Sequence, residues 1–129
     1  MNSIARLGFT FASGIGLIGV LAAASSPAAL SGAEGGLWEV SRSGLPHERI
    51  CVPAPAALAQ LEHRQAKCES SVVRDSGAVA TIHYTCTDGG YGHSSLTLVT
   101  PRSLRVETQG ISANAPFKYT FQARRVGNC

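Results

Sequence analysis

Polar and apolar residues alternate in short runs from residue 68 to the end of the chain. The runs read CESSVVRD, AVATIHYTC, HSSLTLVT, SLRVETQGI and PFKYTFQARRVGNC. Residues that favour turns separate them at positions 75–77, 88–92, 101 and 114–116. An alternation with a period of two places successive side chains on opposite faces of a strand. The pattern therefore predicts an up-and-down antiparallel meander.

One face of this meander is expected to carry the apolar side chains. The inward set consists of Ala80, Ile82, Tyr84, Cys86, Leu96, Leu98, Leu104, Val106, Phe117, Tyr119, Phe121 and Ala123. A strand around Trp38 and a partner strand around Ile50 precede it. We predict a mainly β fold with one short helix, in which six or seven strands form a curved antiparallel meander sheet or half-barrel.

The first 33 residues have the layout of a secretory signal peptide. Arg6 is followed by an uncharged run over 7–24 and by small residues with a proline, and no acidic residue precedes Glu34. A retained membrane anchor is the alternative, because a run of 18 residues just reaches spanning length. Four glycines in the run favour cleavage instead. We predict a signal peptide at 1–33 and a single β-rich domain at 34–129.

Two small-x-small sites compete for cleavage. Ser31-Gly32-Ala33 is the preferred site and Ala22-Ala23-Ala24 is its rival. Lipid attachment is not expected, because Ala24 stands where a lipobox needs cysteine. The mature protein is expected in the periplasm or secreted, without stable membrane insertion. Its basic residues are scattered rather than clustered, which argues against nucleic-acid binding.

All four cysteines, at positions 51, 68, 86 and 129, follow the leader. An even number in a short exported chain favours two disulfides, and three pairings are possible. Spacings of 17, 18 and 43 residues provide no close pair for a metal, and free thiols remain a further alternative. Because strand parity puts Cys86 and Cys129 on one face, we predict the bonds Cys86–Cys129 and Cys51–Cys68. The second bond would limit a helix starting near Pro55 to about two turns.

Several of these features together resemble a known family. They are GLWEV at 36–40, Cys51 opening a helical insert, Cys68, TCTDGG around Cys86, and the closing Arg-x-x-Gly-x-Cys at 124–129. This combination is similar to the small exported bacterial proteins catalogued as domain of unknown function 3617. The resemblance implies periplasmic residence and the cysteine framework, and it implies no activity. The SRSGLPHER connection is shorter than the Met- and Gly-rich stretch of the family, which argues against a function located there.

Candidate chemistry is sparse. His83 and His93 are expected to point outward on neighbouring strands, in a register that places Cys86 opposite Gly92, with Asp88 in the loop between them. These three residues could bind a transition metal or perform acid–base chemistry, although a solvated sheet face explains them equally well.

Other polar residues are assigned to the surface. His47 and His63 are expected there, as is a Glu107–Lys118 pair beside Val106 and Tyr119. The exported part has no G-x-S-x-G motif and its carboxylates are scattered, so no nucleophile or paired-acid site is predicted, and no cofactor.

Three functional hypotheses follow. The first is a non-enzymatic envelope protein that binds a small apolar ligand or a partner protein through its concave face or an edge strand. Possible ligand-facing residues are Trp38, Tyr84, Tyr119 and Phe121, although Trp38 could simply pack in the core. The second is a periplasmic metal-dependent or hydrolytic enzyme that uses His83, His93 and Asp88. The third is a structural envelope component without a defined site.

Overall fold

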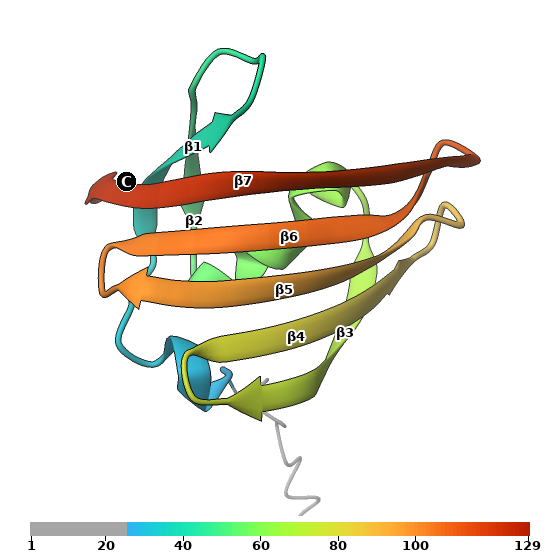
Figure 1. Ribbon diagram of the computed structural model, residues 1–129. Helices are drawn as coiled ribbons and strands as arrows, with labels where there is room; N and C mark the ends of the chain where they lie inside the picture. The colour runs from blue at the N-terminus through green and yellow to red at the C-terminus, as the bar shows by residue number, and fades with distance from the viewer. Residues whose placement is uncertain (1–25) are drawn as a thin grey trace, which may run out of the picture.

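The computed structural model describes residues 26–129, which fold into one seven-stranded antiparallel sheet with the strand order β2-β1-β7-β6-β5-β4-β3 (Figure 1). The mainly β, antiparallel fold predicted from the alternation is confirmed. The strands are β1 (Gly36–Arg42), β2 (Glu48–Val52), β3 (Cys68–Ser76), β4 (Val79–Cys86), β5 (Tyr91–Thr100), β6 (Ser103–Ser112) and β7 (Ala115–Gly127). The predicted leader lies largely outside the described residues.

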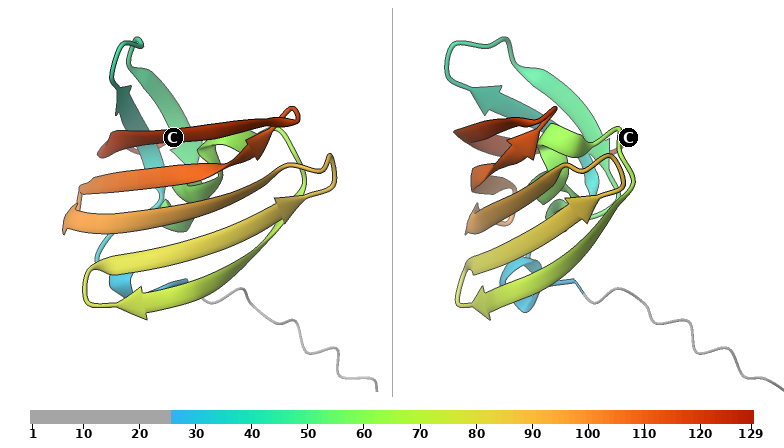
Figure 2. Two further views of the ribbon diagram at one scale, coloured as in Figure 1. Left: turned by 45° about the vertical axis from the view of Figure 1, so that its right-hand side comes forward. Right: turned by 90° about the vertical axis from the view of Figure 1, so that its right-hand side faces the viewer.

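The sheet is strongly curved, and two short 3-10 helices lie on its concave side (Figure 2). The first, η1 (Ala28–Leu30), packs against β3, β4 and β5, and the second, η2 (Pro55–His63), packs mainly against β5 and β6. The helix η2 starts at the predicted proline and is interrupted at Gln60. No helix of the described part of the chain is long and apolar enough to cross a membrane.

The predicted inward face forms the core. Eight of its members are buried: Ala80, Ile82, Tyr84, Leu96, Leu104, Val106, Phe121 and Ala123. The other four are half-buried. Trp38 is completely buried and its partner across β1 and β2 is Ile50, as expected. The indole N–H donates to the carbonyl oxygen of Glu34 at 3.1 Å, which satisfies its polar group inside the core.

The predicted register of the β4–β5 hairpin is wrong by two residues. Gly92 lies opposite Tyr84 rather than Cys86, and His83 lies directly opposite His93. The hairpin closes where the Cys86 N–H donates to the Gly90 carbonyl, at 2.8 Å. The Tyr84 ring fills the space that a side chain at position 92 would occupy, so the large residue needs this glycine as its partner.

The register of the β6–β7 hairpin also differs from the prediction. Glu107 lies opposite Thr120, and Lys118 lies opposite Gln109, so the predicted Glu107–Lys118 pair does not form. The two residues at the tip, Ala113 and Asn114, have φ values of +49° and +63°. Positive φ at both central positions is the conformation of a two-residue type I′ hairpin, and this turn fixes the register.

The predicted disulfide pairing is wrong. The bonds are Cys51–Cys129 and Cys68–Cys86, and no cysteine is free. Cys68 lies opposite Cys86 in the β3–β4 ladder, with their Cα atoms 3.9 Å apart. Cys129 reaches Cys51 because β7 pairs with β1, a contact that strand parity cannot reveal. The predicted limit on the length of η2 does not apply either, because Cys51 and Cys68 are not bonded to each other.

Candidate functional site

The four aromatic residues predicted to face a ligand have different positions. Trp38, Tyr84 and Phe121 have relative exposures of 0%, 2% and 1%, so they are packed within the core. Tyr119 instead borders a hollow of about 320 Å³ between the β1–β2 hairpin and η2. The structure therefore supports the interpretation that Trp38 packs in the core.

The hollow beside Tyr119 is lined by charged groups that neutralise one another. The Tyr119 hydroxyl donates to Glu62 Oε2 at 2.9 Å, and the Arg42 guanidinium lies 3.5 Å from the centre of the Tyr119 ring. Arg64 donates to Glu48 at 2.5 Å, which raises the pKa of Arg64. Burial first, and then the Glu62 carboxylate, raise the pKa of Tyr119. These groups hold η2 against β1, β2 and β7.

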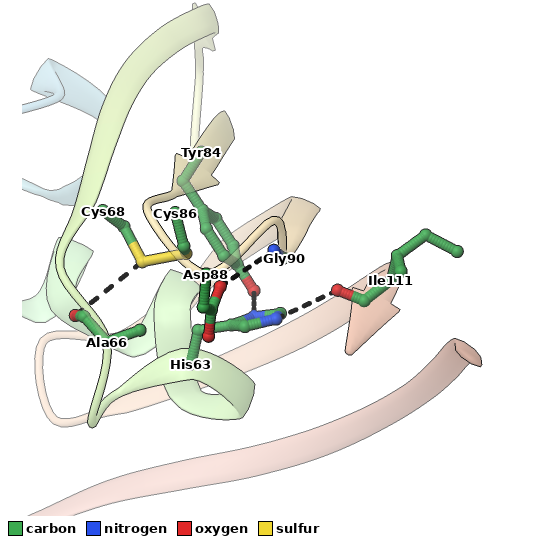
Figure 3. The surroundings of a disulfide bond; sticks show 8 residues. All are labelled: His63, Ala66, Cys68, Tyr84, Cys86, Asp88, Gly90 and Ile111. Atoms are coloured by element: carbon green, nitrogen blue, oxygen red, sulfur yellow. Dashed lines mark hydrogen bonds between the residues drawn. A yellow bond between two sulfur atoms is a disulfide. The ribbon is translucent and has the colours of Figure 1, made fainter. Parts of the chain in front are cut away.

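His63 is the polar residue whose position the sequence analysis missed. It was expected on the surface, but it is 6% exposed at the end of η2 (Figure 3). Its Nε2 lies 3.0 Å from the carbonyl oxygen of Ile111, which can only accept, so Nε2 carries a hydrogen. Its Nδ1 lies 2.9 Å from the Tyr84 hydroxyl, which donates to it when the ring is neutral. His63 therefore joins η2 to β4 and β6.

Tyr84 takes part in the same buried network. Burial and, to a smaller extent, the Glu62 charge raise the pKa of Tyr84 to about 12. Nearby, the Ser94 hydroxyl donates to the Ala59 carbonyl oxygen and lies 2.7 Å from the Thr108 hydroxyl. These polar groups satisfy one another between η2 and the sheet, so they secure the helix on the concave face.

The outward-facing residues His83 and His93 lie next to each other. The ring centroids of His83 and His93 are 4.1 Å apart, and burial followed by the charge of His83 lowers the pKa of His93. Asp88 does not join them: its carboxylate accepts from the Gly90 N–H at 2.8 Å, in the loop beside His63 (Figure 3). Within residues 26–129 no group of three or more His, Cys, Asp or Glu side chains could hold a metal ion.

A hollow lies beside the edge strand β3. It measures about 510 Å³ and is lined mostly by small side chains: Ser26, Pro27, Ala54, Ala56, Ala57, Gln60, Ser70, Ser71, Val72 and Ile82. One wall is β3 and the other is the start of η2. Within residues 26–129, β3 is the last strand of the sheet and has a strand neighbour only on the β4 side.

The sequence contained one signal for this edge. The run CESSVVRD has no regular apolar alternation, and every residue of β3 after Cys68 is exposed. Val72 and Val73 are 42% and 52% exposed, and a bulge lies between Val72 and Arg74. A strand with no buried face is typical of a sheet edge, although the sequence analysis treated it as one more strand of the meander.

The GLWEV segment at 36–40 and the closing Gly-x-Cys at 127–129 lie side by side. Leu37 of the GLWEV segment pairs with Gly127 of the closing Gly-x-Cys, and Cys129 is bonded to Cys51. The sequence model of one protein family matches residues 33–129. The chain belongs to this family, described as protein of unknown function (DUF3617). No curated protein and no solved structure matches this DUF3617 chain.

Proposed function

We propose that this DUF3617 protein is an exported, non-enzymatic module of the bacterial envelope that binds an extended segment of a partner protein along β3. Export is supported by the composition of the leader and by two disulfides, which are typical of oxidising compartments. The observation that carries the binding proposal is the free edge of β3 and the hollow beside it.

A binding role fits the polar residues better than a catalytic one. His63 and Tyr84 are engaged in the core, and Arg64 and Glu62 are engaged in pairs that hold η2. The His83–His93 pair lies on the outer face of the sheet, and Asp88 is turned to its own loop. Acid–base chemistry needs groups that converge on a space where a substrate can sit. His63, Glu62 and Arg64 are instead engaged in contacts that hold η2 on the sheet.

The proposed occupant is an extended polypeptide rather than a compact ligand. An edge strand presents a row of unpaired N–H and C=O groups, and an added strand satisfies them. The segment Glu69–Val72 precedes the bulge and keeps a continuous register with β4, so it can accept such a strand. Ser70, Ser71 and Val72 also line the hollow, where small side chains leave room for residues of the partner.

The Cys68–Cys86 bond makes this edge suitable for binding. It joins the first residue of β3 to the last residue of β4, so the edge strand cannot peel away from the sheet at that end. A strand that is held before it binds loses less conformational entropy when the partner adds to it. The opposite end of β3 is held by Asp75, whose carboxylate accepts two backbone N–H groups of η1.

Site-specific photo-crosslinking in the intact envelope tests the proposal. A photoreactive residue replaces Val72 in one variant and Val99 in a control, because Val99 is also an exposed valine but lies on β5 inside the sheet order. We expect position 72 to crosslink to one short segment of a partner and position 99 not to do so.

A peptide with the sequence of that crosslinked segment should then bind the purified protein, and Ser71→Arg should weaken the binding of this peptide at least tenfold. Equal crosslinking at both positions, or unchanged peptide binding by Ser71→Arg, would contradict the proposal.

A further inference from the structure

The segment in front of β1 is part of the folded domain. Pro27 is buried, and Ala29, Leu30 and Ala33 have relative exposures of 6%, 3% and 9%. These side chains belong to the hydrophobic core, and η1 covers the end of the concave face formed by β3, β4 and β5 (Figure 2). Removing residues up to Ala33 would expose this part of the core.

A specific polar contact also holds the segment. The Asp75 carboxylate accepts the Ala28 N–H at 2.7 Å through Oδ2 and the Ala29 N–H at 2.8 Å through Oδ1. The first N–H groups of a helical turn have no partner within the turn, and a carboxylate there satisfies them and favours the local dipole. Asp75 lies 46 residues beyond Ala29 in the chain, so this is a tertiary contact of the folded domain.

The backbone of the segment also forms regular hydrogen bonds of its own. The Leu30 N–H donates to the Pro27 carbonyl at 3.1 Å, and the Ala33 N–H donates to the Leu30 carbonyl at 3.0 Å. The preferred small-x-small site of the sequence analysis, Ser31-Gly32-Ala33, therefore falls inside a turn of the domain. A leader that is cleaved off does not need to fit the mature fold. This segment does fit it, because Leu30 is buried in the core and Asp75 accepts two of the segment's N–H groups.

We infer that the exported chain keeps residues 27–33 and that processing occurs at Ala22-Ala23-Ala24, with Ser25 as the first mature residue. The inference rests on the proposed export, and it assigns the processing site and a structural role to η1. The mature domain then begins in front of Pro27, and η1 closes the open end of the core. The family match starts at residue 33, so it includes only the last residue of this segment.

Intact mass spectrometry of the reduced protein from the periplasm gives the test. We expect the mass of a chain that starts at Ser25. A chain that starts at Glu34 would overturn the inference while export itself stands. An uncut chain in the cytoplasm would overturn both.

A variant of the precursor gives an independent reading. If residue 30 stays in the mature domain, Leu30→Ala changes the mass of the exported protein and lowers its Tm by about 10 °C or more, because a buried leucine is truncated. If processing followed Ala33, the mature protein from this variant would be identical to wild type in mass and Tm, and the inference would fail. Leu45→Ala is the matched control: Leu45 is 51% exposed, so its mass should change and its Tm should not.

Asp75→Ala tests the polar contact. We expect its Tm to fall by about 4–8 °C, the effect of losing one helix-capping interaction in a domain of this size. Glu69→Ala is the control, since Glu69 is another exposed acid of β3. An Asp75→Ala protein as stable as the Glu69→Ala protein would contradict the role given to this carboxylate.

Discussion

Among single residues, His63 joins the helix η2 to the concave face of the sheet. It is a buried imidazole with both ring nitrogens engaged, one by the Tyr84 hydroxyl and one by the Ile111 carbonyl. A polar side chain in the core is stable when every polar atom has a partner, and it becomes costly when one partner is removed. The burial of His63 could not be predicted from the sequence, because His63 lies next to charged residues in a stretch with a weak apolar stripe.

Replacing His63 should be strongly destabilising. His63→Leu removes both hydrogen bonds and leaves the Tyr84 hydroxyl buried without a partner, so we expect a loss of about 2–3 kcal/mol in the free energy of unfolding. Adding Tyr84→Phe to this variant should cost less than Tyr84→Phe costs in wild type, because the hydroxyl has already lost its partner. Urea unfolding measures all three variants. His47→Leu is the exposed control, and a His63→Leu protein as stable as this control would refute the role of the network.

Tyr84 should also make stability depend on alkaline pH. Its pKa in the folded protein is raised to about 12, mainly by burial, whereas a tyrosine of the unfolded chain ionises near pH 10. Below pH 10 Tyr84 is protonated in both states, and its full contribution to the free energy of unfolding is present. Between pH 10 and 12 the unfolded chain loses the Tyr84 proton and the folded chain keeps it, so the free energy of unfolding falls as the pH rises. Titration of the tyrosinate absorbance should show a component near pH 12 that Tyr84→Phe removes. A component of Tyr84 near pH 10 would contradict this.

At the scale of elements, the sequence predicted which segments are strands and which side chains point inward, because both depend only on a period of two. It did not predict the register, because a shift of two residues keeps every side chain on its face. Tyr84 opposite Gly92 and the type I′ turn at Ala113-Asn114 decide the two hairpins. The edge position of β3 has one trace in the sequence, the lack of apolar alternation in CESSVVRD, and the strand order establishes it.

The Tyr84–Gly92 pairing leads to a prediction for the β4–β5 hairpin. A methyl group added at Gly92 would collide with the Tyr84 ring, which cannot move without breaking its contact with His63. We expect Gly92→Ala to cost about 1–3 kcal/mol of stability, the usual penalty for overpacking. Gly127→Ala is the control, since a methyl group there meets nothing within 4 Å. Thermal unfolding of the two variants should separate them, and equal Tm values would argue against this register.

At the scale of the whole molecule, the pairing of β1 with β7 determines the architecture. It brings the first and last strands together, leaves β2 and β3 as the two edges, and places Cys129 beside Cys51. The predicted disulfide pairing was wrong because side-chain parity determines which face a cysteine occupies but not which strands are neighbours. The number and face of the strands could be read from the chain, whereas their order depends on contacts between its two ends.

The two disulfides should contribute unequally to stability. In the chain-entropy model the loop closed by Cys51–Cys129, with a separation of 78 residues, stabilises the domain by about 4.5 kcal/mol, and the loop closed by Cys68–Cys86, with a separation of 18, by about 3 kcal/mol. Paired Cys→Ser variants compared by urea unfolding should therefore rank in that order. The reverse order would contradict a purely entropic effect of the loops.

Disulfide mapping of the native protein tests whether β1 lies between β2 and β7, the pairing on which the architecture depends. Trypsin cuts between all four cysteines and yields the peptides 50–64, 68–74, 75–102 and 126–129. Without reduction, we predict that 50–64 is linked to 126–129 and that 68–74 is linked to 75–102. A link from 126–129 to 75–102, or a free thiol at Cys129, would contradict the strand order and the fold described above.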